Sequence, residues 1–199
     1  MQWWSVSKIH YDTLNNIAYA FIFLCPSSTI KKEKVGINNK GKPAYKKTYV
    51  PVSARNCSFK ERGITGSLLL TILAQIRKPL IKNGTYEALD NIMSVEQTVQ
   101  AILSNKALKD PNFDIIVFHK RSDMPETEAI FYYIRNAFAH GSFQVITSDF
   151  GNVFLLESKK NNKITAQMRI KEKTLKRYIQ LLEKTPSQIK NIRVQRSED

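Results

Sequence analysis

The chain has 199 residues, of which 42% are hydrophobic, and its 31 lysines and arginines outnumber 17 acids to give a net charge of +14. The apolar content can fill a core, which excludes a disordered chain, and the length predicts one domain with an elaboration. The excess of cations favours a polyanionic partner such as nucleic acid over a neutral metabolite.

The cysteines and histidines argue against the common structural and metal sites. Cys25 and Cys57 form no CxxC pair and the three histidines are scattered, so the sequence predicts neither a disulfide framework nor a zinc site. We therefore expect no metal and no cofactor. The apolar run 17–25 is too short to span a bilayer and lacks the charged start of a signal peptide, so we expect a cytoplasmic protein without a membrane partner.

The charge is distributed in blocks along the chain. Residues 31–62 hold ten lysines and arginines against two acids, a net of +8, and residues 157–196 hold twelve against three, a net of +9. Residues 87–128 hold eight acids against four cations, a net of −4. Two basic blocks around an acidic middle favour a directed basic surface, with an ordinary solvated face as the alternative for either block.

Residues 1–62 are predicted as a first unit, a helix and a basic insertion packed on the core. The apolar spacing of residues 1–30 is close to helical and ends at Pro26. The basic segment 31–62 carries interleaved tyrosines and can form a short strand, a lid or a solvated insertion; such segments can bind single-stranded nucleic acid. Its candidate RNA-binding residues are Lys46, Lys47, Arg55, Lys60 and Arg62.

Residues 63–186 are predicted as the main domain, and it begins with helices. An apolar stripe from Ile64 to Ile76 predicts the first helix. Thr85 can cap a second helix that runs to Met93, and a capping box at Ser94 starts a third. The run 115–118 is too short for periodicity to decide between helix and strand.

The end of the main domain changes period. Residues 143–170 alternate and predict a three-stranded antiparallel meander, with Asn161-Asn162 as a two-residue hairpin turn. A last amphipathic helix covers 174–182, and residues 187–199 are predicted as a flexible tail. The candidate RNA-binding residues here are Lys171, Lys173, Lys176 and Arg177.

The functional prediction depends on a helix from about residue 125 to 139. It is apolar and aromatic at first, and then places Arg135, Asn136 and His140 where more core would be expected, with Gly141 at a typical stop position. Buried polar groups need partners or a function. Arg135 and His140 would lie well apart in an unbroken helix, so we expect Gly141 to loosen the last turn and bring the imidazole towards the guanidinium.

The spacing of Arg135, Asn136 and His140 resembles the R-x4-H motif of the HEPN superfamily. The resemblance covers roughly residues 63–185 and implies a mainly α fold: an antiparallel helical bundle with a small three-stranded antiparallel β insert after the motif helix. The predicted order of motif helix, three-stranded insert and basic helix is similar to a bacterial branch of the superfamily that is found in plasmid and mobile-element proteins. The alternative interpretation of the motif is a helix end in which Arg135 caps carbonyls or pairs with a carboxylate, and His140 interacts with the helix dipole.

The resemblance implies a metal-independent endoribonuclease that cleaves RNA by attack of the 2′-hydroxyl, leaving 2′,3′-cyclic phosphate and 5′-hydroxyl ends. Histidine can transfer the protons, and arginine is suited to phosphate oxygens. One chain offers a single such pair, so the site is expected to be composite, completed by a second copy in a homodimer. Asn136 would orient His140 or hold a phosphate oxygen. The supporting residues would be Glu128, Tyr132 and Gly141.

Three functions remain open from the sequence. The first is the endoribonuclease, as a toxin or anti-phage effector controlled by an antitoxin or sensor protein. The second is a catalytically inactive HEPN-type module that binds RNA or nucleotides. The third is a basic protein–protein module in which the Arg-His pair is structural. The sequence contains no GxxxxGK[ST] loop, which argues against a P-loop enzyme.

Overall fold

The fold is built around β4, Asp114–His119, a strand whose side chains enter two separate cores. The computed structural model describes residues 9–25, 28–37, 39–51, 58–105, 108, 110–148 and 151–194. In it Ile116 and Phe118 face the main core, whereas Ile115 and Val117 face a smaller one. A strand covered on both faces reads as a continuous apolar run, which explains why periodicity left this segment undecided.

Five strands form the central mixed sheet, in the order β3-β4-β7-β6-β5. The outer strand β3 is parallel to β4, and the remaining neighbours are antiparallel. The bounds of the other four strands are Gly84–Leu89 (β3), Phe143–Ser148 (β5), Gly151–Lys160 (β6) and Lys163–Lys171 (β7).

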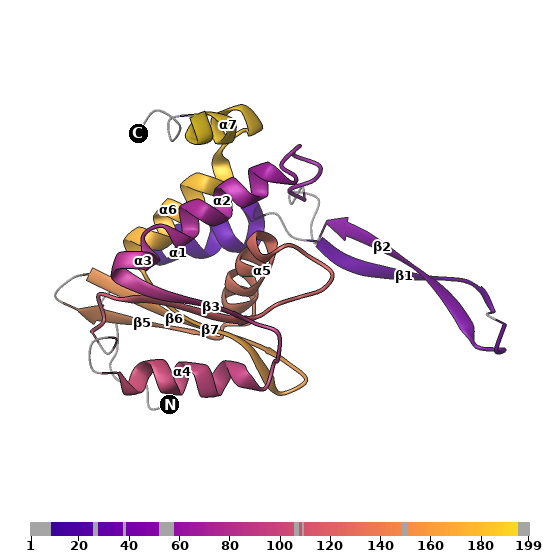
Figure 1. Cartoon of the computed structure of the whole chain (residues 1–199), viewed down its shortest axis with the longest axis horizontal. Coiled ribbons are helices and arrows are strands. Elements are labelled where there is room, and N and C mark those ends of the chain that lie inside the picture. Colours follow the sequence, from indigo (N-terminus) through magenta and orange to yellow (C-terminus); the bar gives the residue numbers. More distant parts are fainter. Residues whose placement is uncertain are drawn as a thin grey trace.

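Helices cover both faces of the sheet (Figure 1). The helix α4, Ser94–Ser104, connects β3 to β4 and packs with its Val95 and Val99 in the smaller core. The opposite face carries the main core and the other helices. These are α1 (Tyr11–Tyr19), the π-helical turn η1 (Ala20–Leu24), α2 (Ser67–Arg77), α3 (Leu80–Asn83), α5 (Glu126–Ala139), α6 (Glu172–Glu183) and α7 (Pro186–Val194).

The predicted HEPN-like antiparallel helical bundle with a small three-stranded insert is wrong. The chain is α+β, and its main sheet has five strands rather than three. The three strands after the motif helix do form, and Asn161 and Asn162 turn the hairpin with positive φ angles of 50° and 60°. They are not an insert, however, because β7 pairs with β4 and so joins the meander to the β3–α4–β4 unit.

The predicted helix from Thr85 to Met93 is also wrong, because its first half is the strand β3. Gly84 shows why the chain extends here. A Cβ atom at Gly84 would collide with the carbonyl oxygen of Asp114 and come within 2.7 Å of the Leu80 side chain. Only glycine allows β3 to begin this close to β4, and the pairing across thirty residues then overrides the helical spacing.

Both ends of the described chain belong to the main body. Ile17 and Phe21, in the helix predicted within residues 1–30, are buried in the main core together with Phe59. At the other end, the predicted flexible tail 187–199 is helical as far as Val194, and Ile189 on α7 is buried. Residues 195–199 lie outside the described chain.

A two-stranded arm extends from this body (Figure 1). Strands β1, Ser28–Ile37, and β2, Pro43–Pro51, pair antiparallel and form a sheet of their own. The arm occupies most of the basic segment for which a short strand, a lid or an insertion was predicted. A two-stranded hairpin buries little apolar surface, so its sequence can be polar along its length.

Candidate functional site

Helix α5 places the predicted motif on a half-exposed polar stripe. Glu128, Tyr132, Arg135 and Asn136 are all half-buried and follow one another along one side of the helix, whereas Ile130, Phe131 and Ile134 on the other side are in the main core. The spacing of three and four residues keeps the polar side chains on neighbouring turns. The structure therefore brings four of the predicted residues onto one surface.

The helix ends as predicted at Gly141, which has a φ of +64°. The amide of Gly141 donates to the carbonyl of Phe138 at 3.2 Å, and the amide of Ser142 donates to that of Ala137 at 2.8 Å. These two hydrogen bonds make a Schellman motif. His140 is the C-cap, and the motif requires the residue after it, Gly141, to be in the left-handed region.

The motif does not bring Arg135 and His140 together within one chain. The helix stays regular through Ala139, and five helical residues separate two side chains by about 140° around the axis. His140 is exposed, and its backbone amide donates to the carbonyl of Asn136 at 3.0 Å. Among the described residues no hydrogen bond joins the two side chains. The expectation that Gly141 rotates the imidazole towards Arg135 is wrong, because the turn begins only after His140.

Arg135 has an unusual environment for a cation. Its Nη1 donates to the Oδ1 of Asn136 at 3.3 Å, but its Nε is buried without a hydrogen-bond partner. It also lies near the thiol of Cys25, which follows η1. Burial raises the pKa of that thiol, and the charges of Arg135 and Arg62 act weakly in the opposite direction. The guanidinium therefore retains a donor that nothing in the described chain satisfies.

The start of the stripe contains an arginine that the sequence analysis missed. Arg121 lies 4.4 Å from the centre of the Tyr132 ring and donates from Nε to a carboxylate oxygen of Asp123 at 2.8 Å. The guanidinium therefore covers one face of the Tyr132 ring and holds the ring in place through a cation–π contact. The signal in the sequence was the pair of opposite charges two residues apart in the turn before α5.

Glu128 is a half-buried acid on the same stripe. Burial raises the pKa of its carboxyl above the ordinary value. The folded state then holds the proton more tightly than the unfolded state, so the contribution of Glu128 to stability is lost as the pH rises through the raised pKa.

We expect Glu128→Gln to stabilise the protein at pH 7 by about 0.5 kcal/mol, because it removes a partly desolvated charge. At pH 4, where the carboxyl is protonated, the gain should shrink towards zero. Urea unfolding at both pH values measures this difference. The exposed Glu96→Gln on α4 is the matched control, and an equal gain in both variants would contradict the account based on burial.

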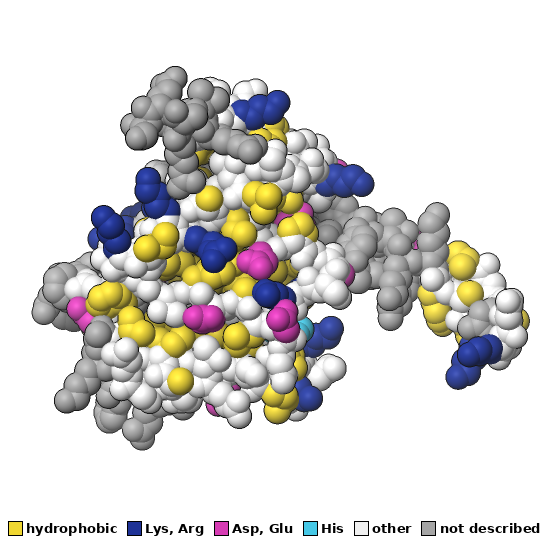
Figure 2. Space-filling model, viewed as in Figure 1, with side chains coloured by type: hydrophobic (Ala, Val, Ile, Leu, Met, Phe, Trp, Pro, Cys, Tyr) yellow, Lys and Arg dark blue, Asp and Glu magenta, His cyan; other side chains and the backbone are white. Residues whose placement is uncertain are grey.

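The arm supplies a second candidate site. Between Ser28 and Pro51 the sequence has seven lysines and a single acid, Glu33. Tyr45 is 54% exposed, and Val35 and Ile37 near the far end of the arm are 61% and 70% exposed. Figure 2 shows hydrophobic side chains and a cation at the far end of the arm, away from the main body. Charge together with an exposed aromatic ring suits a single-stranded nucleic acid.

No known protein family, curated protein or solved structure matches this chain. The resemblance to the HEPN superfamily therefore depends on Arg135, Asn136 and His140 alone.

The predicted RNA-binding residues divide into three groups. Lys60, Lys173 and Lys176 are exposed, although Lys176 pairs with Glu172 on its own helix. The side chains of Lys46 and Lys47 and the whole of Arg55 lie outside the described residues. The remaining three have structural partners, as follows.

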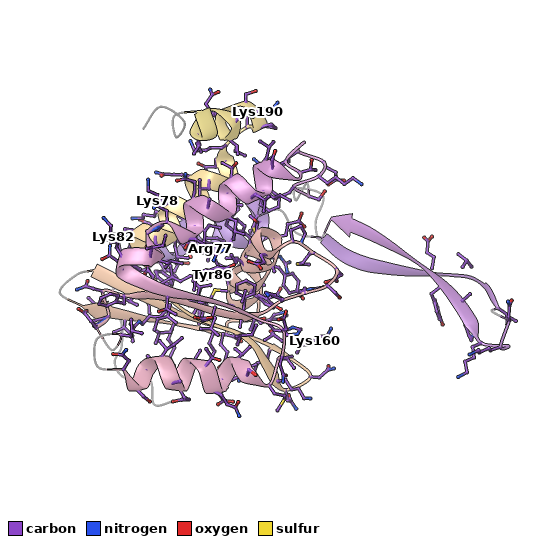
Figure 3. All side chains as sticks on the ribbon, in the orientation of Figure 1. Arg77, Lys78, Lys82, Tyr86, Lys160 and Lys190 are labelled. Atoms are coloured by element: carbon purple, nitrogen blue, oxygen red, sulfur yellow. The ribbon has the colours of Figure 1, made fainter. Side chains whose placement is uncertain are left out.

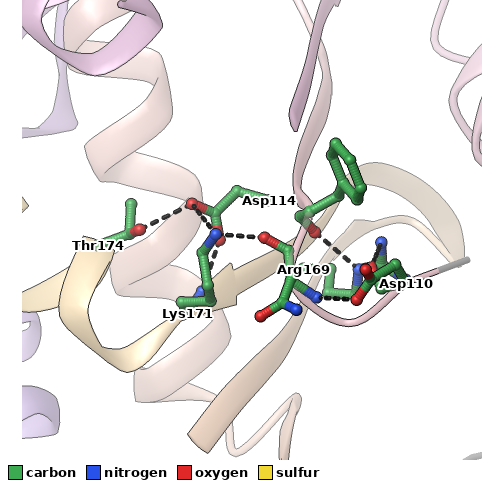
Figure 4. Close-up of polar contacts among 7 residues, drawn as sticks. Asp110, Asp114, Arg169, Lys171 and Thr174 are labelled. Atoms are coloured by element: carbon green, nitrogen blue, oxygen red, sulfur yellow. Dashed lines mark hydrogen bonds and ion pairs between the residues drawn. The ribbon is translucent and has the colours of Figure 1, made fainter. Parts of the chain in front are cut away.

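Arg62 and Arg177 hold neighbouring segments of the body together. Arg62 donates to the carbonyl of Lys184 at 3.3 Å, and Arg177 donates to that of Gln75 at 2.9 Å. Lys171 is only 8% exposed. It donates from Nζ to the carbonyl of Asn112 and lies 3.8 Å from a carboxylate oxygen of Asp114 (Figure 4). These three cations therefore stabilise the fold rather than form a free basic surface.

The described residues offer no group of three or more histidines, cysteines and acids that could hold a metal ion. Within the same residues, no helix has the length and apolar character needed to cross a membrane.

Proposed function

We propose that the protein binds single-stranded RNA, with the β1–β2 arm as the main contact. One observation carries the proposal: a two-stranded ribbon with seven lysines and one acid extends from the body of a chain with a net charge of +14. Cations displayed away from the body can follow a phosphate backbone without sequence preference, and the exposed Tyr45 offers a face for one base.

The body of the protein offers further support for this proposal. Lys60 and Lys173 are exposed and lie in the two basic blocks of the sequence. Because an RNA of moderate length can contact the arm and part of the body together, the affinity should grow with RNA length until both are covered.

A salt titration tests the proposal. A fluorescein-labelled single-stranded RNA of twenty nucleotides is titrated with the protein between 50 and 200 mM KCl. Four phosphate contacts predict a slope of about −3 in log K against log salt, or roughly a fiftyfold loss across this range. Single-stranded DNA and duplex RNA of the same sequence serve as comparisons. An affinity for RNA that does not change with KCl concentration, or that equals the affinity for a neutral polymer, contradicts the proposal.

A metal-independent endoribonuclease is the second candidate, and the half-exposed Arg135 beside Asn136 on α5 favours it. A guanidinium on a half-exposed stripe is suited to a phosphate oxygen. Since Arg135 and His140 lie apart in one chain, this candidate requires a homodimer in which the second copy supplies the other group. A toxin or defence role, with an antitoxin or sensor as partner, depends on this candidate alone.

This candidate predicts that the protein cuts labelled RNA in EDTA, and that His140→Ala or Arg135→Ala lowers the rate at least about a hundredfold. Sedimentation of the same samples reports the oligomeric state. Cleavage that persists in both variants, or that needs added Mg²⁺, excludes the mechanism. Full activity of a monomer excludes the composite site separately.

A further inference from the structure

A groove runs beside the open edge of the central sheet, on the side opposite β5. Its volume is about 750 Å³. It is bounded by the last turns of α2, by α3 and by the first half of β3. The lining residues are Ala74, Arg77, Lys78, Leu80, Ile81, Gly84, Thr85 and Tyr86. Among the described lining residues none belongs to the α5 stripe or to the arm, so the groove is separate from both candidate sites.

The backbone of β3 faces the groove with hydrogen-bonding groups that the sheet does not use. The carbonyl of Leu89 accepts from the amide of Lys120 at 2.7 Å, on the β4 side. Backbone groups alternate along a strand, so Thr85 and Glu87 also face β4, whereas Tyr86 and Ala88 point to the other side. In the described part of the chain no strand pairs there. An uncovered edge of this kind is a template for another strand.

The walls of the groove combine cations with apolar side chains. Arg77 and Lys78 line it, and no acid is among the described lining residues; Lys82 follows on α3 (Figure 3). Ile81 is 83% exposed, and Leu80 and Ala74 lie at the base of the same surface. In Figure 2 hydrophobic side chains lie beside the cations over this face, with a few acidic side chains among them. Such a lining suits a ligand that is both acidic and apolar.

The aromatic ring in the groove is not free for a nucleobase. The guanidinium of Arg77 lies 4.7 Å from the centre of the Tyr86 ring, and Phe118 packs against the ring edge-on. The Tyr86 hydroxyl donates to Glu126 at 2.9 Å. A single-stranded RNA would therefore find charge but no stacking face, and its backbone cannot complete a β ladder. A peptide can use the edge, the cations and the apolar surface together.

We propose that β3 is a docking edge for an extended acidic segment of a partner protein, which adds to the sheet as a further strand. The partner's backbone pairs with Tyr86 and Ala88. Because α2 and α3 lie on the same face of the sheet, the partner's side chains on that face include both acids, for Arg77 and Lys78, and apolar residues, for Ile81 and Leu80. In this mode of recognition the main-chain hydrogen bonds supply affinity and the alternate side chains supply specificity. The proposal does not depend on RNA binding, because it uses neither the arm nor α5.

Amide hydrogen exchange measured by NMR tests the pairing directly. The probe is a capped hexapeptide, Thr-Glu-Thr-Val-Thr-Glu, whose glutamates and valine lie on one face of an extended strand, at millimolar concentration. We expect exchange at Tyr86 and Ala88 to slow at least about tenfold, while Glu87, which already faces β4, is the internal control. The same peptide with N-methylated alternate residues cannot pair and should give no protection. Unchanged exchange at both Tyr86 and Ala88 overturns the proposal.

Charge and ligand class are tested on the same system. Lys78→Glu should weaken the peptide at least about fivefold, and Lys190→Glu, an exposed change of the same kind on α7, should leave it within twofold (Figure 3). The same peptide with lysine in place of each glutamate should bind less well than the glutamate peptide. Equal effects of the two variants overturn the proposal. So does protection of Tyr86 and Ala88 by single-stranded RNA in place of the peptide.

Discussion

Excision of the arm is expected to lower the affinity for single-stranded RNA by roughly a hundredfold, because it removes about four phosphate contacts. The strand register shows where to cut. Ile30 pairs with Tyr49, so replacing residues 31–48 with an Asn-Gly turn closes a short hairpin on the same base. All seven lysines of the arm are removed together, and so is Tyr45.

We expect the excision to leave the stability of the body nearly unchanged. The arm is a sheet of its own and extends away from the central sheet, so the temperature of unfolding is expected to stay within a few degrees. A second variant keeps the full arm and changes its seven lysines to glutamine, which separates charge from shape. It should lower both the affinity and the salt slope. An excised protein that binds RNA within twofold of the wild type would remove the arm from the proposed function.

Asp114→Ala is expected to destabilise the protein by about 3–5 kcal/mol, the usual cost of breaking a buried charge pair. Asp114 is 3% exposed. One carboxylate oxygen accepts the backbone amide of Lys171 at 2.8 Å, and the other accepts the hydroxyl of Thr174 at 2.7 Å (Figure 4). Burial raises the pKa of this carboxyl, and these donors with the Lys171 ammonium oppose the shift.

The cluster joins the start of β4 to the end of β7 and the first turn of α6, which follow it by 57 and 60 residues. Removing the carboxylate leaves the Lys171 ammonium buried beside a single carbonyl and leaves Thr174 without its acceptor. Urea unfolding at pH 7 measures the loss. A loss of this size is a large fraction of the free energy of unfolding of a typical domain, which is about 5–15 kcal/mol.

Two further variants separate charge from shape at this cluster. Asp114→Asn keeps the volume and one acceptor, and should cost less than Asp114→Ala. The double variant Asp114→Ala with Lys171→Met removes both charges, and should recover part of the stability lost by Asp114→Ala. A loss below about 1 kcal/mol for Asp114→Ala, or no recovery in the double variant, would contradict a structural role for the pair.

The sequence by itself determined the elements whose signals are local. The apolar stripe from Ile64 to Ile76 predicted α2, and the aromatic run before Arg135 predicted α5. Gly141 ended that helix and Asn161-Asn162 turned the β6–β7 hairpin, since both positions need positive φ angles that few residues adopt. The alternation after residue 143 likewise predicted three strands correctly. In each case residues close in sequence carry the whole physical reason.

Only the tertiary structure decided how these elements combine. Whether 84–89 is a helix or a strand depends on its pairing with β4, thirty residues away, and the same pairing turns a predicted bundle into a five-stranded sheet. The roles of single side chains were decided in the same way. Lys171, predicted as an RNA ligand, is instead held by Asp114 and Asn112, and Arg135 donates to its neighbour Asn136, with no hydrogen bond to His140 among the described residues. Contacts between distant segments leave no periodic trace in the sequence, so neither charge counts nor motif spacing could reveal them.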